Sequence, residues 1–240
     1  MKYVQFAFGF LTTLPVKIHE DWQPGDLGRA AAWFPLVGLF LGAGLVAGHW
    51  LLAQIFPPAV AAVGLVILWA VLTGGLHLDG LADCCDGLLA STSRERRLEI
   101  LRDPRLGTFG GVGLGLHLLL KVSLVGALAP ERVLWALLFA PVVARWLILL
   151  VARQPMARPG GLGADFAMGL SLPMFVGAAL LPLGLLATDW PRTLLAAGLA
   201  HLVVVGVIRL ARARLGGVTG DVMGLVVELG ETAALIAFVI

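Results

Sequence analysis

Three aspartates lie close together in the stretch His77–Gly87, which reads HLDGLADCCDG and ends a long apolar run. Asp79, Asp83 and Asp86 are spaced by four and three residues, so on a helix their side chains lie along one stripe. Three like charges on one stripe repel one another unless a cation or a basic ligand compensates them. Carboxylate oxygens suit Mg²⁺ or Mn²⁺, and Mg²⁺ commonly joins carboxylates to substrate phosphates. The stretch therefore predicts a divalent-metal site, with a solvated helix end as the alternative.

A second acidic group lies near the C-terminus, in GGVTGDVMGLVVELGE. Asp221 and Glu228 are seven residues apart and share one face of a helix, and Glu231 lies further along. Ionisable residues within an apolar span are candidates for a functional site. We expect this group to meet the first aspartates at the same side of the membrane.

Basic residues follow the aspartates in STSRERRLEILRDPRLGTFGG. Arg102 and Arg105 either neutralise phosphates or belong to the general charge bias of the chain. Lys121 and Arg145 fall inside apolar segments, where each needs an anionic partner or a hydrated cavity. Both an anionic substrate and a structural ion pair meet that need.

Histidines and glycines beside these groups allow two interpretations. His77, two residues before Asp79, is the histidine that we expect at the site, whereas His117 and His201 are typical of packed or hydrogen-bonded side chains. Glycines also open the apolar segment that follows the basic stretch. Its first amides could face an anion, but glycine also serves close helix packing in membranes.

The composition places these residues in a bilayer. Hydrophobic residues make up 59% of the 240-residue chain and charged residues only 13%, about half the usual share of a soluble domain. The mean hydropathy is +0.95. Apolar stretches of about 20 residues, long enough to cross roughly 30 Å of hydrocarbon as helices, recur along the chain. We predict an all-α, polytopic membrane helical bundle and exclude a large soluble domain.

About seven transmembrane helices are expected in one membrane domain, residues 1–240. Residues 1–15 are predicted to form a short helix ended by Pro15 that lies at the interface or is tucked against the bundle, without a cleaved signal peptide. Residues 78–107 are predicted to form a cytoplasmic active-site segment. Pro141 and Pro182 are candidates for kinks. The expected spans are 33–56, 58–77, 108–128, 133–152, 172–188, 192–210 and 222–240.

The distribution of lysine and arginine orients the bundle. With the N-terminus in the cytoplasm, only Arg132 and Arg192 lie outside, and seven spans place the C-terminus outside. The residues then inside or at the inner boundary are Lys2, Lys17, Arg29, Arg94, Arg96, Arg97, Arg102, Arg105, Arg153, Arg158, Arg209, Arg212 and Arg214.

The net charge of +2 is small, and we expect no nucleic-acid partner. The two cysteines, Cys84 and Cys85, are adjacent, which predicts reduced thiols that fill space in a helix. The expected partners are small-molecule substrates and the lipid bilayer, and a homo-oligomer is compatible with the sequence.

The string GGLHLDGLADCCDGLLA, followed by RRLEILRDPRLGTFGG, resembles the signature of the cobalamin synthase family, the adenosylcobinamide-GDP ribazoletransferases. The segments QFAFGFLTTLPV, WFPLVGLFLG and GGVTGDVMGLVVELGE resemble that family in order and spacing. Cys84 and Cys85 stand where small or polar residues are expected, which affects no proposed ligand.

This resemblance implies a Mg²⁺-dependent membrane enzyme of the bacterial inner membrane whose active site faces the cytoplasm. It would join adenosylcobinamide-GDP to α-ribazole, or to its 5′-phosphate, with release of GMP, in the last steps of cobalamin biosynthesis. It implies a metal site of Asp79, Asp83, Asp86 and Asp221, with Glu228, and Arg102, Asp103, Arg105 and Lys121 towards substrate. From the residues themselves we add His77 and Arg145 towards substrate and expect Asp83 or Asp86, which the sequence does not distinguish, to act as the base.

Two rival functions are weighed against this one. A CDP-alcohol phosphotransferase also uses clustered aspartates, but Asp83–Gly87 gives only D-x-x-D-G, without the Ala-Arg that follows in that family. A transporter would use charges within the membrane such as Lys121 and Arg145. It would not need three aspartates on one stripe of a helix.

Overall fold

The structure, a computed structural model, describes residues 1–16 and 23–240 and is built from helices. Lys17, one of the residues used for the orientation, lies outside the described part. Apart from the helices, the described residues contain one isolated bridge between Met156 and Val218. In chain order the helices are α1 (Lys2–Leu11), α2 (Asp26–Ala30), the 3₁₀ turn η1 (Ala31–Trp33), α3 (Phe34–Ile55), α4 (Pro58–Thr73), α5 (Leu76–Leu89), α6 (Arg94–Ile100), α7 (Thr108–Ala127), α8 (Pro130–Ala152), α9 (Gly161–Gly169), α10 (Leu172–Leu185), α11 (Arg192–Leu215) and α12 (Gly220–Val239).

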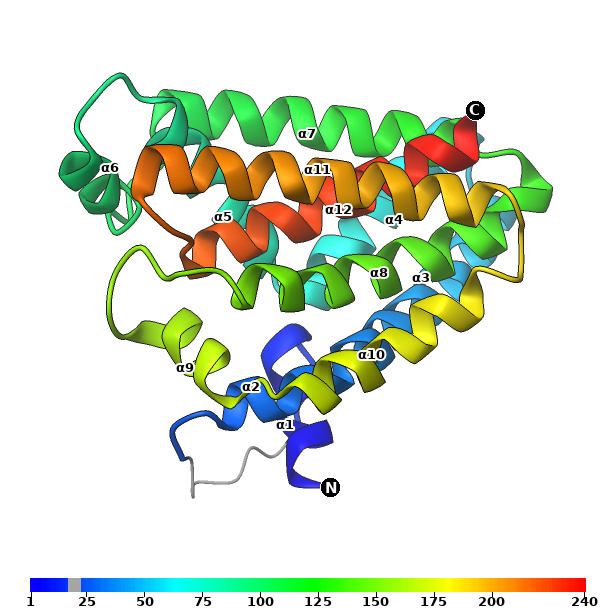
Figure 1. The fold of residues 1–240 in the computed structure, drawn as a ribbon. Helices are drawn as coiled ribbons and strands as arrows, with labels where there is room; N and C mark the ends of the chain where they lie inside the picture. Colours follow the sequence, from blue (N-terminus) through cyan, green and yellow to red (C-terminus); the bar gives the residue numbers. More distant parts are fainter. Residues whose placement is uncertain (17–22) are drawn as a thin grey trace.

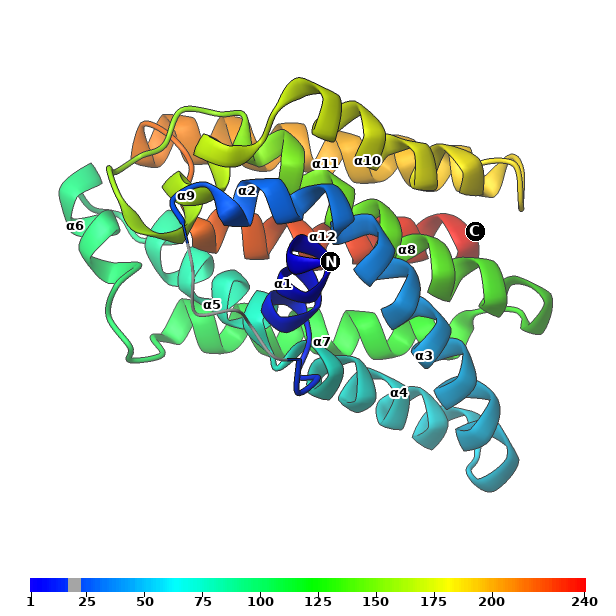
Figure 2. The same cartoon turned by 90° about the horizontal axis from the view of Figure 1, so that it is seen from below.

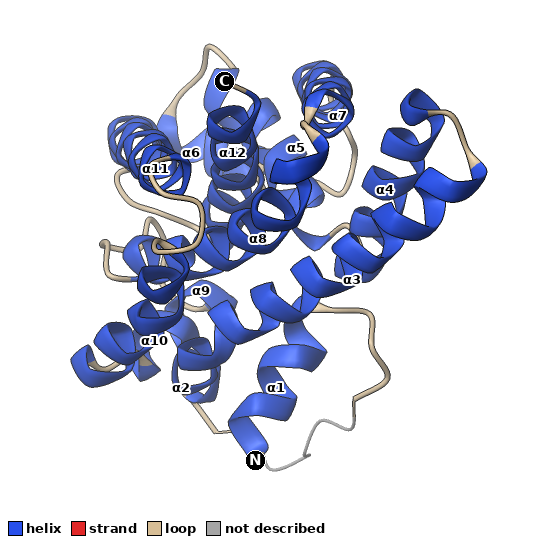
Figure 3. Cartoon of the chain, turned by 90° about the vertical axis from the view of Figure 1, so that its right-hand side faces the viewer, coloured by secondary structure: helices blue, strands red, loops and turns tan. Residues whose placement is uncertain are grey.

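Helix α12 is the centre of the bundle. Of its most apolar stretch 83% is buried, against 28% for α7 and for α11. Figures 1 and 3 show α12 enclosed by α5, α7, α8 and α11, while α3 and α10 cross the lower side. The outer helices instead expose large apolar side chains, such as Leu119 on α7, Leu180 on α10 and Leu202 on α11. In a bilayer such side chains face lipid, so this pattern confirms the predicted membrane bundle.

Five helical segments among the described residues are long and apolar enough to cross a membrane, and seven if each of two bent helix pairs counts as one span. Five of the seven expected spans agree with helices of the structure. Most of their ends differ from the helix ends by no more than a few residues. Helix α8 begins at Pro130, before the expected residue 133, and α11 continues to Leu215. Both α8 and α10 run through their internal prolines, Pro141 and Pro182.

The expected span 58–77 is wrong as a single helix. Helix α4 ends at Thr73, and α5 leaves it at an angle of 94°. Gly74 and Gly75, between the two helices, have φ angles of 62° and 68°, a left-handed conformation that glycine adopts without steric cost. The three aspartates consequently lie on a separate helix, packed against α7 and α12, and not at the end of a straight span.

A similar bend changes the expected span 172–188. Helix α10 covers only Leu172–Leu185 and meets α9 at 98°. At the N-terminus the predicted helix is present as α1, which ends at Leu11. Figure 2 shows α1 on the lower side of the bundle, beneath α8 and α12. The last residues of α1 line a cavity together with α9 and the start of α12.

Candidate active site

Helix α5 presents the three aspartates from the sequence motif. Asp79 is exposed, and Asp83 and Asp86 are half-buried. The C-terminal end of α5 is fixed by Arg97 of α6, whose Nη1 donates to the carbonyl oxygens of Gly87 (3.1 Å) and Leu88 (3.0 Å). A cation at this end also matches the partial negative charge of the helix terminus. Arg97 therefore has a structural role at the end of α5.

A fourth aspartate comes from the first turn of α12. Thr219 caps this helix by accepting from the amide of Val222 (3.4 Å), and its Oγ1 donates to Asp221 Oδ2 (3.1 Å). The backbones of α5 and α12 approach closely where Gly80 faces Gly224. A Cβ on Gly80 would lie 2.8 Å from the Asp221 carbonyl oxygen, and one on Gly224 would lie 3.2 Å from the Gly80 Cα. Two glycines thus bring Asp221 beside the aspartates of α5.

The four carboxylates form one electrostatic group. The negative charges of Asp79, Asp86 and Asp221 each repel the carboxylate of Asp83. The carboxylates of Asp79 and Asp83 make no hydrogen bond or ion pair with another residue in the described ranges. Among the described residues, Arg158 forms an ion pair with the group, its Nη2 lying 3.7 Å from Asp221 Oδ2. The group therefore carries unneutralised negative charge, which favours a cation.

Asp86 differs from the other three aspartates. Its Oδ2 accepts from the Gly107 amide (2.7 Å) and its Oδ1 from the Gly110 amide (2.8 Å). The first amides of α7 do face an anion, as one interpretation of the sequence held, and that anion is Asp86 itself. Any Cβ at Gly110 would overlap the Asp86 carboxylate, so glycine is required there. Asp86 thereby ties α5 to α7 and fixes the loop before α7.

The carboxylates do not form a metal cage made of protein ligands alone. Within residues 1–16 and 23–240, no group of three or more His, Cys, Asp or Glu side chains stands in an arrangement that could hold an ion. Mg²⁺, however, is usually bound by one or two carboxylates with substrate phosphates and water completing its shell. The unpaired carboxylates of Asp79 and Asp83, with Asp221 facing them, fit that kind of site better than a cage made only of protein ligands.

The predicted basic residues near the aspartates lie on the exposed loop after α6. Arg105 donates three hydrogen bonds to the Asp103 carboxylate, from its backbone amide (3.1 Å), its Nε (2.9 Å) and its Nη2 (2.6 Å). These bonds lower the pKa of Asp103 to about 2, so it stays ionised. Arg105 and Asp86 line one groove of about 330 Å³, and Arg102 is exposed. The loop is therefore accessible to an anionic ligand beside the aspartates.

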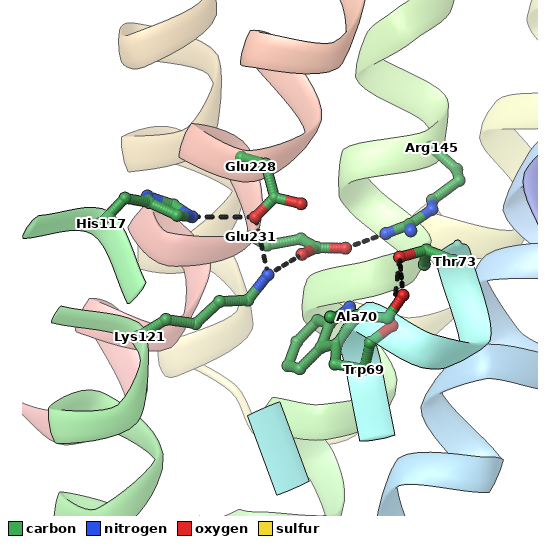
Figure 4. Close-up of polar contacts among 8 residues, drawn as sticks. All are labelled: Trp69, Ala70, Thr73, His117, Lys121, Arg145, Glu228 and Glu231. Carbon is green, nitrogen blue, oxygen red and sulfur yellow. Dashed lines mark hydrogen bonds and ion pairs between the residues drawn. The ribbon is translucent and has the colours of Figure 1, made fainter. Parts of the chain in front are cut away.

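Lys121 and Arg145 lie elsewhere, in a buried cluster between α7, α8 and α12 (Figure 4). Lys121 Nζ donates to Glu228 Oε2 (2.9 Å) and Glu231 Oε2 (2.6 Å), and Arg145 pairs with Glu231. His117 Nε2 contacts Glu228 Oε2 at 2.8 Å. With neutral histidine the cluster has as many negative as positive charges.

This cluster places three of the expected site residues away from the aspartates. Lys121 and Arg145 are 2% and 0% exposed and pair with carboxylates of α12, which is the ion-pair alternative, and a role towards substrate stays a prediction. Glu228 faces Lys121 and His117 and lies about two helical turns from Asp221, not among the aspartates. Buried charges of this kind must be paired, and here each partner is another side chain.

His77 lies in the wall of a cavity beside the aspartates. It is 4% exposed and lines a cavity of about 160 Å³ together with Asp79 and Asp221. Arg158, by contrast, was not predicted as a site residue. It reaches Asp221 from the segment between α8 and α9, and no local spacing in the sequence signals that contact.

Comparisons with known proteins match this chain over nearly its whole length. The chain matches the family model described as cobalamin-5-phosphate synthase over residues 3–239. It is 44% identical over 236 residues to a Deinococcus radiodurans protein named adenosylcobinamide-GDP ribazoletransferase, which covers 98% of this chain and 84% of the relative. Proteins with that name from Geotalea daltonii and Pseudomonas aeruginosa are 40% and 42% identical, over 97% and 96% of this chain and 95% of each relative. No solved structure matches the chain.

Proposed function

Because the chain belongs to the cobalamin-5-phosphate synthase family, we propose that it transfers α-ribazole, or its 5′-phosphate, to adenosylcobinamide-GDP with release of GMP. The observation that supports this placement of the reaction is the group of four aspartates that α5 and α12 bring together. The two rival functions, a CDP-alcohol phosphotransferase and a transporter, receive no support from the relatives.

The bonds made and broken follow from the substrates. A ribose hydroxyl of the ribazole attacks the phosphorus that carries the cobinamide arm, and the bond from this phosphorus to the bridging oxygen breaks. GMP leaves with that oxygen, and the hydroxyl proton passes to a base. Asp83 is the best candidate for this base because its carboxylate has no partner in the described structure, whereas both oxygens of Asp86 accept amides of α7.

Two cationic groups act on the pyrophosphate in this proposal. One or two of the carboxylates of Asp79, Asp83 and Asp221 would hold Mg²⁺ together with substrate phosphates and water, and the ion would supply electrostatic stabilisation of the phosphate oxygens and of the leaving GMP. Arg158, next to Asp221, and the exposed Arg102 and Arg105 orient the phosphates from the protein side. The carboxylates of the chain thus position the reaction and take its proton.

The site faces the cytoplasm of a bacterial cell in this proposal. Figure 1 has α6, α9 and the start of α12 at one end of the bundle, and the C-terminus and the α7–α8 turn at the other. The arginines of α6 and of the following loop thus lie at the end that contains the aspartates. The excess of basic residues at this end supports its location on the inner side of the membrane.

The direct test uses purified protein in detergent or lipid nanodiscs with Mg²⁺, adenosylcobinamide-GDP and α-ribazole. We expect GMP and a corrinoid that carries the ribazole to appear in equal amounts, and only when both substrates are present. GMP release that does not depend on α-ribazole would instead indicate hydrolysis and contradict the proposed transfer.

A further inference from the structure

An aromatic cavity opens beside the aspartates, between α1, α2, α5, α9 and α12. It has a volume of about 160 Å³ and reaches Asp79 and Asp221 at its edge. Phe10, Phe34 and Phe166 line it, with ring centroids 6.1 Å apart for the first pair and 5.5 Å for the second. Three aromatic rings from separate parts of the chain therefore form one continuous wall.

The wall is held in place by contacts outside the cavity. Asp165, next to Phe166 on α9, accepts from the amides of Gly25 (2.5 Å) and Leu27 (3.4 Å) at the start of α2. Phe34 and Phe166 are 1% and 2% exposed. The aromatic surface is thus preformed, which lowers the entropic cost of binding a flat ligand.

The rest of the lining is apolar except near the aspartates and at one histidine. Leu11 and Leu27 complete the wall. His77 lines it as well, and its buried Nδ1 has no hydrogen-bond partner among the residues that the structure describes. A buried polar atom without a partner is costly, and a ligand that pairs with it removes that cost.

We propose that this cavity binds the dimethylbenzimidazole base of the ribazole substrate, with His77 Nδ1 donating to the ring nitrogen that is not attached to ribose. The inference rests on the proposed function. A base in this position places its ribose at the mouth of the cavity, next to Asp79 and Asp221. The sugar hydroxyl that attacks then lies beside the carboxylate group.

The other two bulky groups of the substrates fit the cavity less well. Guanine has several donors and acceptors along its edges, and an apolar wall would leave most of them unpaired. The corrin macrocycle is far larger than a cavity of about 160 Å³. The alkylated benzimidazole has one free acceptor, which matches the unpaired Nδ1 of His77 in this lining.

The first test compares two buried phenylalanines by steady-state kinetics of GMP release. Phe166→Leu should raise the KM for α-ribazole on the order of tenfold, as expected for a lost apolar contact, and leave the KM for adenosylcobinamide-GDP unchanged. Phe139→Leu is the matched control, because Phe139 is 1% exposed but packs on Phe238, away from the cavity. A rise in the KM for adenosylcobinamide-GDP, or no change for either substrate, would overturn the proposal.

A second test uses the unmodified protein, so it does not depend on whether a variant folds. The analogue in which dimethylindole replaces dimethylbenzimidazole has a C–H at the position of the free ring nitrogen. We expect its KM to exceed that of α-ribazole on the order of tenfold, and His77→Leu to abolish the difference. Equal KM values in the unmodified protein would exclude the histidine contact. The proposed function is judged separately, by whether α-ribazole yields GMP at all.

Discussion

At the level of single residues, the aspartates of α5 have different roles. Asp83 is free to act on a ligand, whereas the two oxygens of Asp86 accept the Gly107 and Gly110 amides of α7. The spacing of four and three residues predicts that they share a stripe, but it cannot distinguish them. The contacts that do so join Asp86 to residues 21 and 24 positions further along the chain.

This difference predicts unequal effects on stability. Asn has one acceptor oxygen, so Asp86→Asn cannot accept both amides and should lower the free energy of unfolding by about 1 kcal/mol, the usual value of a helix cap. Asp83→Asn loses no hydrogen bond and relieves repulsion, so its stability should be equal or higher. Thermal unfolding in detergent without substrates measures both. Equal destabilisation by the two changes would argue against the capping role of Asp86.

The buried cluster leads to a second prediction. Lys121→Met leaves two buried carboxylates with one fewer cation, which should destabilise the protein by about 3–5 kcal/mol and lower its yield in the membrane. The double variant Lys121→Met/Glu228→Gln restores the charge balance and should recover much of that loss. Molecules that do fold should keep full specific activity. A single variant with normal yield and low activity would instead mean that Lys121 acts on substrate.

At the level of helices, hydropathy predicts most of the long spans but not the two sharp bends. The segment 58–77 is apolar throughout, so its composition does not mark the end of a helix. The bend depends on Gly74 and Gly75, which have positive φ angles. Other glycines of this chain lie within straight helices, so a glycine in the sequence does not by itself predict a bend. Likewise, only the packing of Gly80 on Gly224 brings Asp221 beside the aspartates of α5. The sequence predicts that the two acidic groups meet, but not the helix geometry that joins them.

The bend can be tested through its second glycine. A Cβ at Gly75 would touch nothing within 4 Å, so Gly75→Ala tests the backbone alone. With φ at 68° it should cost about 1–2 kcal/mol and lower the rate by shifting the aspartates. Gly115 in α7 also has open space but an ordinary φ, so Gly115→Ala should be neutral or stabilising. Equal thermal stability of the two variants would show that the bend is not fixed by this residue.

At the level of the whole molecule, the charge distribution predicts its orientation in the membrane. Cysteines at the exposed positions Glu95 and Arg102, in a background without Cys84 and Cys85, should react with a membrane-impermeant reagent only from the cytoplasm. One at Glu131, at the start of α8, should react only from outside. Labelling of intact cells reports the outer side of the membrane, and labelling of inverted vesicles reports the cytoplasmic side. Labelling of positions 95 and 131 from the same side would contradict the orientation.

The central claim, that the carboxylates of α5 and α12 form a divalent-metal active site, is tested most directly by the Mg²⁺ dependence of GMP release. Asp79→Asn and Asp83→Asn should each lower kcat on the order of a hundredfold and shift the dependence to higher Mg²⁺ concentration. The control Asp189→Asn alters an ion pair with Arg192 at the opposite end and should behave as the unmodified protein. Near-normal turnover of the Asp79 and Asp83 variants at limiting Mg²⁺ would show that the metal binds elsewhere.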